Sequence, residues 1–461
     1  MPTALVRNGR VVTASESYDA DLYLDGGKVA LVGQGLSLPA DTVLDASGCL
    51  ILPGGIDAHT HLDMPAGELT SADDFATGTR AAAFGGTTTV IDFATPQPGE
   101  SLLAALETWR RKAEGKAAVD YGFHMALRGV GDTTLAEMAR LTRDEGVVSF
   151  KLYLAYPGVL QVDDAAFFRA LLGARECGAL PLVHAENGGV IEVLVKQALA
   201  RGETAPRYHA LTRPAETEAE ATARAISMAT LAGAPLYVVH LTCGAALAHV
   251  TAARDRGQPV FAETCPQYLF LSVADYDRPG FEGAKYVMSP PLREAADQEA
   301  LWRGLAGGDL QVVATDHCPF TLADKARGRD DFSKIPNGAP GIETRMMLLW
   351  DGGVRTRRID AQRFVELTAA GPARLFGLWP RKGTIAVGSD ADLVVWDPER
   401  ETRLAVDTLH MRVDYSPYEG RIVRGGPVVV MSRGEVIVDR GEWKGLPGRG
   451  QFLKRQPSHP A

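Results

Sequence analysis

VVSFKLYL, at residues 147–154, places one amine, that of Lys151, inside an otherwise apolar run. Because apolar residues occupy both alternating faces, the run predicts a strand that is covered on both sides, as strands of parallel sheets are. Other runs of this kind carry residues that can bind metal ions: ILPGGIDAHTH at 51–61, LPLVHAEN at 180–187, LYVVHLT at 236–242 and LQVVATDHCPF at 310–320. This recurrence of a polar residue near the end of a buried strand indicates an enzyme.

Working outward from these runs, we count eight strand-like segments, each followed by a stretch with helical character. Ser71 is the expected N-cap of the first helix, and Asp163 and Gly178 are the expected start and stop of a later one. Eight strand–helix units over about 320 residues predict an α/β fold of the (β/α)8, or TIM-barrel, class. The expected strands are 50–58, 87–94, 120–127, 147–154, 180–187, 235–242, 259–265 and 310–316.

The two ends of the chain have a different pattern of predicted elements, with short strands separated by Asn-Gly and Gly-Gly turns. We expect residues 1–51 and 378–445 to form one small composite β-sandwich domain beside a barrel domain at 52–377. Residues 446–461 are rich in Gly, Pro and basic side chains, which predicts an extended tail.

Composition excludes several classes of protein. The chain of 461 residues has 48 Lys+Arg and 57 Asp+Glu, a formal net charge of −9, which gives no electrostatic footprint for nucleic acid or an anionic membrane. No run of about 18 apolar residues predicts a membrane span. Five scattered cysteines without a CxxC pair, and an N-terminal segment unlike a signal or transit peptide, favour a cytoplasmic protein with reduced thiols.

The polar residues of the strand ends should meet, because the carboxyl ends of all barrel strands lie at one mouth. His59 and His61 are separated by one residue, so on an extended strand both imidazoles point to the same side and can share one ion. Taken alone, such a pair is as readily explained by two hydrogen-bonded histidines at a polar rim.

Lys151 is the most informative member of the set, because an unpaired ammonium ion is costly to bury. Three explanations are open: an ion pair with a carboxylate across the barrel, a Schiff-base lysine of lowered pKa, or carbamylation by CO2 to an anionic oxygen ligand that bridges two cations. With histidines and an aspartate at the neighbouring strand ends, the third explanation accounts for the most residues.

The remaining members are His184, His240 and Asp316. A lone buried histidine most often has a structural role, but imidazole is also the commonest ligand of zinc-like ions. Asp316 is either a loop carboxylate or a group that touches a metal and moves a proton. His317 should point elsewhere by strand alternation, and Cys318 more often packs than binds a metal.

The sequence resembles the dihydropyrimidinase/hydantoinase group of the amidohydrolase superfamily over nearly its whole length. The motifs that carry the resemblance are GGIDAHTHLDMP, FGGTTTVIDFA, SFKLYLAYPGV, LVHAEN, VVHLTC, AETCPQYL, MSPPLR, ATDHCPF and GTIAVGSDADLVVWD. The resemblance implies a homotetrameric hydrolase that opens dihydropyrimidines or 5-substituted hydantoins to N-carbamoyl amino acids.

The resemblance also implies roles for individual residues. His59, His61 and Asp316 would hold one divalent ion, expected to be zinc, and His184 and His240 a second. The carbamate of Lys151, an N6-carboxylysine, would bridge the two ions. Asp316 would carry the proton to the leaving nitrogen and Tyr156 would donate to the oxyanion, while Ser289 and Asn337 would bind the ring amide mainly through backbone groups.

Three alternatives stay open on the sequence. Dihydroorotases carry an Arg two residues after the histidine pair, where this chain has Asp63. Allantoinases resemble the chain less around the last strand. Non-catalytic dihydropyrimidinase-like scaffold proteins lose ligands that this chain keeps. The substrate-pocket walls are expected at Leu62, Met64, Tyr153 and Leu160, which leaves the ring substituent and its stereochemistry undecided.

Overall fold

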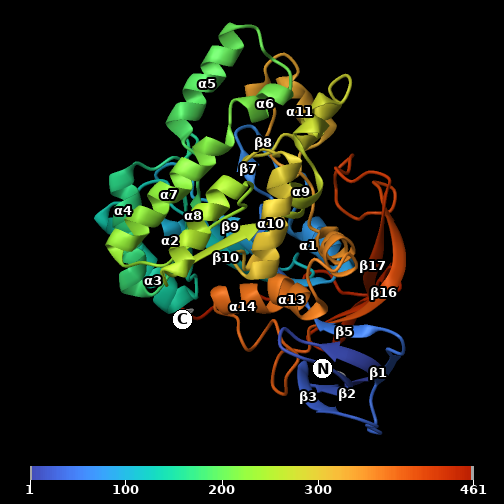
Figure 1. The fold of residues 1–461 in the computed structure, drawn as a ribbon. Coiled ribbons are helices and arrows are strands. Elements are labelled where there is room, and N and C mark those ends of the chain that lie inside the picture. The colour runs from blue at the N-terminus through green and yellow to red at the C-terminus, as the bar shows by residue number, and fades with distance from the viewer. Residues whose placement is uncertain (1–2, 458–461) are drawn as a thin grey trace.

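The computed structural model describes residues 3–457. At its centre, eight strands pair in parallel in the order β15-β14-β13-β12-β11-β10-β9-β6, with helices packed around the outside (Figure 1). The predicted (β/α)8 barrel is therefore confirmed. Its strands are β6 (Gly55–Thr60), β9 (Thr87–Ala94), β10 (Asp120–Ala126), β11 (Ser149–Tyr153), β12 (Leu180–His184), β13 (Leu236–Val238), β14 (Val260–Thr264) and β15 (Val312–Val313).

The first predicted strand, 50–58, is wrong in its extent, because it is divided between two sheets. β5 (Leu50–Pro53) pairs with β1 and β16 outside the barrel, and β6 starts the barrel two residues later. Gly54 lies between them, where a Cβ atom would stand 2.1 Å from Thr88 Oγ1. Only glycine allows the chain to cross so close to its neighbour at this point.

The barrel closes through one isolated backbone bridge, between Thr60 and His317, and through the Asp57 side chain, because its last strand is short. β15 has only two residues, and β6 and β15 are not adjacent in the hydrogen-bonded order. Asp57 fills the gap, because its carboxylate accepts from the Thr315 backbone N–H at 3.1 Å and from the Thr315 hydroxyl at 2.6 Å. This contact fixes the position of the segment that carries Asp316.

The helices follow the strands in sequence and cover the barrel. Among residues 3–457, no helix combines the length and apolar character that a membrane span requires. The helices are α1 (Phe75–Phe84), α2 (Leu102–Ala113), α3 (Asp132–Arg140), α4 (Asp164–Cys177), α5 (Gly188–Ala200), α6 (Arg207–Leu211), α7 (Ala215–Ala232), α8 (Gly244–Asp255), α9 (Pro266–Phe270), α10 (Ala295–Gly307), α11 (Leu322–Lys325), α12 (Arg345–Leu349), α13 (Ala361–Val365) and α14 (Gly371–Leu375).

Two of the three predicted helix caps are confirmed and one is wrong. Asp163 caps α4 by accepting from the Ala166 N–H, and Gly178 ends that helix in the left-handed conformation. The N-cap of α1 is Asp74 rather than Ser71, because the Asp74 carboxylate accepts from the first backbone N–H groups of the helix. Ser71 instead donates its hydroxyl to the His61 carbonyl at 2.7 Å, and so helps to hold a site residue.

Both ends of the chain build a second sheet of nine strands at one side of the barrel (Figure 1). It joins at its middle, where β5 from the first end pairs with β16 from the second. The composite β domain expected from the sequence is thus present as one hydrogen-bonded sheet. Its other strands are β1 (Ala4–Val12), β2 (Ser17–Asp25), β3 (Lys28–Gly33), β4 (Thr42–Asp45), β17 (Arg421–Ser432), β18 (Glu435–Asp439) and β19 (Glu442–Trp443), with β16 at Leu393–Leu404.

A buried charge network joins this sheet to the amino-terminal end of the barrel, the barrel floor. Lys382 Nζ lies 2.7 Å from Asp120 at the start of β10, 2.6 Å from Asp392 and 3.1 Å from Asp390. Arg433, in the turn between β17 and β18, pairs with the same Asp120 carboxylate. Every one of these charges therefore has an opposite charge beside it, as buried ions require.

The C-terminal segment packs beneath the same floor. The Leu453 N–H donates to the Tyr121 carbonyl at 2.7 Å, and the Arg455 N–H donates to the Gly146 carbonyl at 3.1 Å. Both side chains are buried. The described part of the predicted tail thus packs against the barrel of the same chain. Residues 458–461 lie outside the described part of the chain.

Candidate active site

All six proposed metal ligands line one cavity of about 820 Å³ at the carboxyl ends of the barrel strands. His59 lies within β6 and His61 directly after it, and Lys151 lies within β11. His184 ends β12, His240 follows β13, and Asp316 follows β15. Residues separated by more than 250 positions in the sequence therefore face one another, which is the arrangement that the barrel topology predicts.

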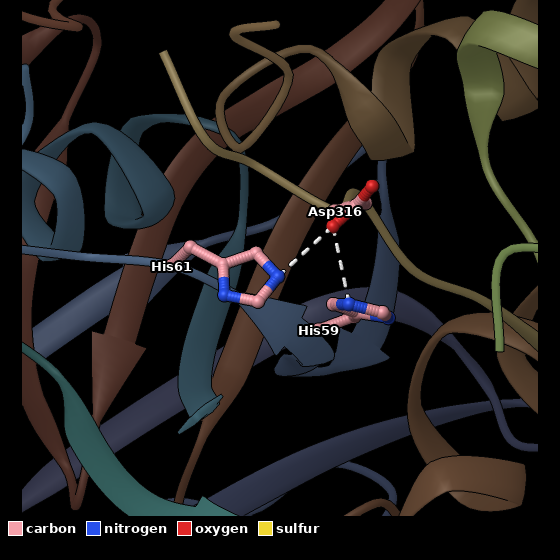
Figure 2. A group of neighbouring side chains, drawn as sticks. All are labelled: His59, His61 and Asp316. Carbon is pink, nitrogen blue, oxygen red and sulfur yellow. Dashed lines mark ion pairs between the residues drawn. The ribbon is translucent and has the colours of Figure 1, made fainter. Parts of the chain in front are cut away.

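His59, His61 and Asp316 form the tighter of two ligand groups. Asp316 Oδ1 lies 3.1 Å from His59 Nε2 and 3.1 Å from His61 Nε2, and Figure 2 shows the two imidazoles converging on this one oxygen. One ligand atom from each residue lies within 4.8 Å of the others. Two imidazole nitrogens and a carboxylate oxygen so close together are a donor set that suits a zinc-like ion.

His184 and His240 form the second group. His184 Nδ1 lies 2.9 Å from His240 Nε2, and the centroids of the two rings are 4.6 Å apart. The centroid of the His240 ring also lies 5.4 Å from that of His59, so the two groups are neighbours. Two imidazole nitrogens that face each other in this way can both turn their lone pairs to one cation.

Lys151 is buried between the two groups without a charged partner. Its Nζ lies 4.9 Å from the centroid of the Phe93 ring and 5.0 Å from that of Tyr153. Among residues 3–457, no hydrogen bond or ion pair to this amine is recorded. Burial lowers the pKa of Lys151 to about 7, partly opposed by Asp316 and Glu263, so the neutral amine is accessible near neutral pH.

The ion-pair explanation for Lys151 that the sequence left open is therefore wrong, since no carboxylate among the described residues lies within ion-pair distance of its amine. The amine stays available for covalent chemistry, and a neutral amine is the form that adds to CO2. A carbamate there would place oxygen atoms between the two histidine groups, so the residues present fit a site for two ions.

Three residues that line this cavity have strained backbones. His240, Asp316 and Tyr156 have φ values of 38°, 51° and 67°, in the left-handed region that non-glycine residues rarely adopt. Such conformations cost about 1–3 kcal/mol each and persist where surrounding structure enforces them. Three of the residues proposed for the site thus owe their orientation to the tertiary structure and not to local preference.

Tyr156 lies at the mouth of the cavity, with its ring centroid 5.2 Å from that of His184. Burial and the nearby Glu186 carboxylate raise its pKa above the ordinary value of 10.0, although hydrogen bonding to Ser289 opposes the shift. The hydroxyl therefore stays protonated at neutral pH and can donate a hydrogen bond. Ser289 and Asn337 line the same cavity.

Three of the four residues expected as apolar pocket walls line the cavity. Met64, Tyr153 and Leu160 line the cavity. Leu62 does not, because it is fully buried behind the strand end, where its side chain approaches Gly78 of α1. The reason is alternation: His59 and His61 point into the barrel, so Leu62 points outward into the core.

The sequence analysis missed two buried carboxylates that hold the histidines. Glu263, at the end of β14, hydrogen-bonds to His59 Nδ1 and also accepts from the Tyr237 hydroxyl at 2.8 Å. Glu186 lies 2.8 Å from His184 Nε2. These contacts leave His59 Nε2 and His184 Nδ1 to face the cavity, because each carboxylate takes the proton-bearing nitrogen on the other side of the ring.

A signal for both carboxylates was present in the sequence. Glu263 stands in PVFAETC and Glu186 in LPLVHAEN, where each is a charged residue at the end of an apolar strand. This is the same pattern that identified Lys151. His317 lies outside the site as predicted by alternation, with its Nε2 3.1 Å from Asp73 and its Nδ1 accepting from the Gly341 N–H. The Cys318 thiol also borders the cavity.

Comparison with known proteins adds an independent finding. Residues 50–437 match the sequence family described as the amidohydrolase family. The chain is 51% identical over 454 residues to a D-hydantoinase of Geobacillus stearothermophilus, covering 98% of this chain and 96% of that protein. It is 53% identical over 457 residues to a D-hydantoinase of Streptomyces coelicolor, covering 98% and 97%.

Solved structures give the same result. A dihydropyrimidinase from Brevibacillus agri superimposes with a TM-score of 0.99 at 50% identity and covers 100% of both chains. An L-hydantoinase (dihydropyrimidinase) from Arthrobacter aurescens superimposes with a TM-score of 0.90 at 32% identity, covering 99% of this chain and 100% of the other. The similarity extends over the whole length, so it includes every strand end described above.

Proposed function

The chain belongs to the amidohydrolase family, and from that membership we propose that it hydrolyses the ring amide of 5-substituted hydantoins and of dihydropyrimidines, giving N-carbamoyl amino acids. One observation carries the proposal: four histidines and one aspartate, the side chains expected to hold the metal ions, converge at one mouth of the barrel around a buried, unpaired lysine. A scaffold protein has no need of this arrangement, which costs stability.

We propose that His59, His61 and Asp316 hold one divalent ion, expected to be zinc. His184 and His240 would hold a second, and carbamylated Lys151 would bridge the two. When bound, such a pair of ions lowers the pKa of water, polarises the ring carbonyl and so supplies a nucleophile near neutral pH. The side chains of this protein then have to orient the ring and move one proton.

Asp316 is suited to move that proton. Burial opposes its ionisation, but in the metal-free protein the positive charge of His59 and hydrogen bonds from His59 and His61 hold the pKa of the carboxyl well below its ordinary range. The carboxyl is therefore ionised, and as a carboxylate it can accept a proton as the nucleophile attacks and deliver that proton to the ring nitrogen as the C–N bond breaks. Both steps need only one carboxylate placed at the mouth of the barrel.

Tyr156 is suited to stabilise the oxyanion that forms on the ring carbonyl. Its hydroxyl stays protonated because burial raises its pKa, and a buried donor that points at developing negative charge lowers the barrier. We propose that Ser289 and Asn337 hold the ring amide through backbone groups. These backbone groups thus bind the ring on one side, while its carbonyl faces the metal ligands.

The substrate class follows from the cavity walls and the relatives. Met64, Tyr153 and Leu160 offer apolar surface to a ring substituent. Identity to chains named D-hydantoinase is 41–53%, against 32% to one named L-hydantoinase, which supports a preference for the D-enantiomer. Dihydroorotate fits less well, because Asp63 lies outside the cavity lining, 3.6 Å from Lys112.

Ring-opening assays test the proposal directly. The purified protein would be given dihydrouracil, dihydrothymine, both enantiomers of phenyl- and alkyl-substituted hydantoins, allantoin and dihydroorotate. We expect turnover of the hydantoins and dihydropyrimidines, with the D-enantiomers faster. No turnover of either class by metal-replete protein would refute the proposed reaction, and faster turnover of allantoin or dihydroorotate would reassign the substrate.

The remaining assignments each have a direct measurement. Elemental analysis should find about two zinc ions per chain, and intact-protein mass spectrometry or a crystal structure should find CO2 added at Lys151. Light scattering tests the predicted homotetramer, and cell fractionation tests the predicted cytoplasmic location.

A further inference from the structure

A second buried lysine lies beside the cavity and takes no part in the proposed chemistry. Lys325, at the end of α11, has no exposed surface. Its Nζ donates to three backbone carbonyls: that of Val287 at 2.8 Å, that of Pro336 at 2.7 Å and that of Gly338 at 2.7 Å. An ammonium ion has three N–H groups, so these three carbonyls use all of them.

The positions of these carbonyls in the sequence are informative. Pro336 and Gly338 flank Asn337, and Val287 precedes Ser289 by two residues. The carbonyls on both sides of Asn337 converge on Lys325, whereas the Asn337 carbonyl has no hydrogen-bond partner among residues 3–457. Asn337 itself lines the cavity.

Other buried side chains hold the rest of the Ser289 segment. His209 Nε2 donates to the Met288 carbonyl at 2.8 Å, and the Tyr268 hydroxyl donates to the Pro290 carbonyl at 2.8 Å. Within residues 3–457, no hydrogen bond is recorded for the backbone N–H or C=O of Ser289 or of Asn337. The Met288, Pro290, Pro336 and Gly338 carbonyls are satisfied, whereas the backbone N–H and C=O of Ser289 and of Asn337 are free in this described part of the chain.

The two segments are also tied to each other. The Gly338 N–H donates to the Val287 carbonyl at 3.0 Å, so Val287 accepts from both Gly338 and Lys325. Gly338 has a φ of 139°, and a Cβ there would stand 2.1 Å from the Cys318 carbonyl, which fixes the chain against the strand that carries Asp316. Lys325 thus joins two segments from different β/α units into one rigid edge of the cavity.

A structural role alone does not explain the choice of lysine. A buried amine without a carboxylate partner is costly, and the carbonyls of a loop are usually satisfied by backbone N–H groups or water. The lysine ammonium differs from those partners because it is one tetrahedral donor group. It sets the relative positions of three carbonyls on two segments.

We propose that Lys325 is a positioning residue for substrate binding, which orients the free backbone groups of Ser289 and Asn337 toward the ring amide of the substrate. The proposal rests on the proposed function, because the ring amide is what these groups would bind. A contact that binds the ring equally well in the ground state and in the transition state lowers KM without changing kcat. Loss of the lysine should therefore affect KM.

The test compares Lys325→Met with Lys382→Met. Both variants remove a buried lysine, but Lys382 belongs to the barrel floor. At a temperature at which both variants are folded, K325M should raise the KM for a 5-substituted hydantoin roughly tenfold with kcat within about twofold, because a lost hydrogen bond of about 1.4 kcal/mol is a factor of ten. K382M should lower thermal stability and leave KM unchanged.

Hydrogen–deuterium exchange of the metal-replete enzyme gives a readout that does not depend on turnover. Exchange at peptides containing Ser289 and Asn337 should increase in K325M and stay as in the wild type in K382M. Lys325→Gln keeps two N–H donors and should give an intermediate KM, and it replaces K325M if that variant does not fold.

The outcomes separate the two proposals. Wild-type KM and wild-type exchange at both peptides in K325M or K325Q, with reduced stability only, would overturn the positioning role. If the wild-type protein opens no cyclic amide, the proposed function fails, while increased exchange at the two peptides would still support the positioning of these groups by Lys325.

Discussion

The two ends of the barrel treat a buried lysine in opposite ways. On the floor, Lys382 lies within 3.1 Å of three carboxylates, those of Asp120, Asp390 and Asp392. At the mouth, Lys151 is equally buried but has no carboxylate at ion-pair distance among the described residues. A paired charge holds two parts of a fold together, whereas an unpaired amine costs stability and is kept for its reactivity.

The surroundings of the two lysines differ only in part. The Asp120 carboxylate is satisfied by Lys382, by Arg433 and by the Gln451 N–H at 3.0 Å. At the mouth, the buried His240 Nδ1 has no hydrogen-bond partner among residues 3–457, and His240 and Asp316 have strained backbones. Strain is not confined to the mouth, because Arg433 on the floor has a φ of 46° and a buried Nε without a partner among residues 3–457. The two ends differ instead in how their buried lysines are paired with carboxylates.

Replacing Lys151 with Ala should disrupt the site at the mouth of the barrel and leave the ion pairs of the barrel floor intact. We expect kcat/KM to fall by about 10³-fold or more, because metal ions contribute several kcal/mol to catalysis and 1.36 kcal/mol is a factor of ten. The metal content should fall as well, and thermal stability of the metal-free protein should not decrease, since no ion pair is lost. Kinetics, elemental analysis and calorimetry check these outcomes.

Small carboxylic acids provide a control for the Lys151 prediction. Acetate or propionate should restore part of the turnover of K151A by supplying carboxylate oxygens where the carbamate would lie. Full activity of K151A without any additive would exclude a role for the lysine in binding the metal ions.

Replacing Lys382 with Met should disrupt the ion pairs of the barrel floor and leave the site at the mouth unchanged. The change leaves Asp120, Asp390 and Asp392 without their shared partner, and removal of one member of a buried ion pair costs about 3–5 kcal/mol. Denaturant unfolding of the metal-free protein measures the loss. If the folded variant also loses kcat by more than a few-fold, the two ends are coupled and the separation drawn here does not hold.

Replacing Glu263 with Gln tests how the His59 ring is held at the mouth of the barrel. The amide is neutral and no longer fixes which His59 nitrogen carries the proton, so we expect metal affinity to fall about 10–100-fold. Competition with a chelator measures this affinity. Tyr237→Phe is the matched control, because it removes another partner of the Glu263 carboxylate and leaves His59 untouched. An equal loss in both variants would mean that Glu263 acts through packing.

Acid should weaken the floor in a way that depends on Asp390. Burial opposes ionisation of this carboxyl, but Lys382, Lys28 and Arg381 lower its pKa below the ordinary 3.8. Its contribution to stability is therefore complete above about pH 4 and is lost as pH falls through the lowered pKa. Asp390→Asn should remove about 1 kcal/mol of this acid-sensitive stability, measured by denaturant unfolding between pH 3 and 7. An unchanged pH profile in D390N would contradict the assignment.

Much of the site could be predicted because its signals are local. A charged or imidazole side chain at the end of an apolar strand is visible in the sequence, and the barrel topology brings such residues together wherever they occur. Glu263 was missed although it carries this signal, because only residues expected to bind a metal ion were selected, and Glu263 contacts His59 instead. Leu62 was misplaced because its apolar character was considered without the alternation that turns it away from His61.

The sequence by itself determined the eight strands, the composite sheet and the residue types at the mouth, because side-chain periodicity and turn residues act over a few neighbours. Only the tertiary structure decided where the first predicted strand divides, which imidazole nitrogens face the cavity and which buried lysine is paired. These depend on contacts between residues hundreds of positions apart, such as Lys382 with Asp120 and His59 with Glu263. Such contacts form only when the barrel closes, and no local pattern encodes their distances.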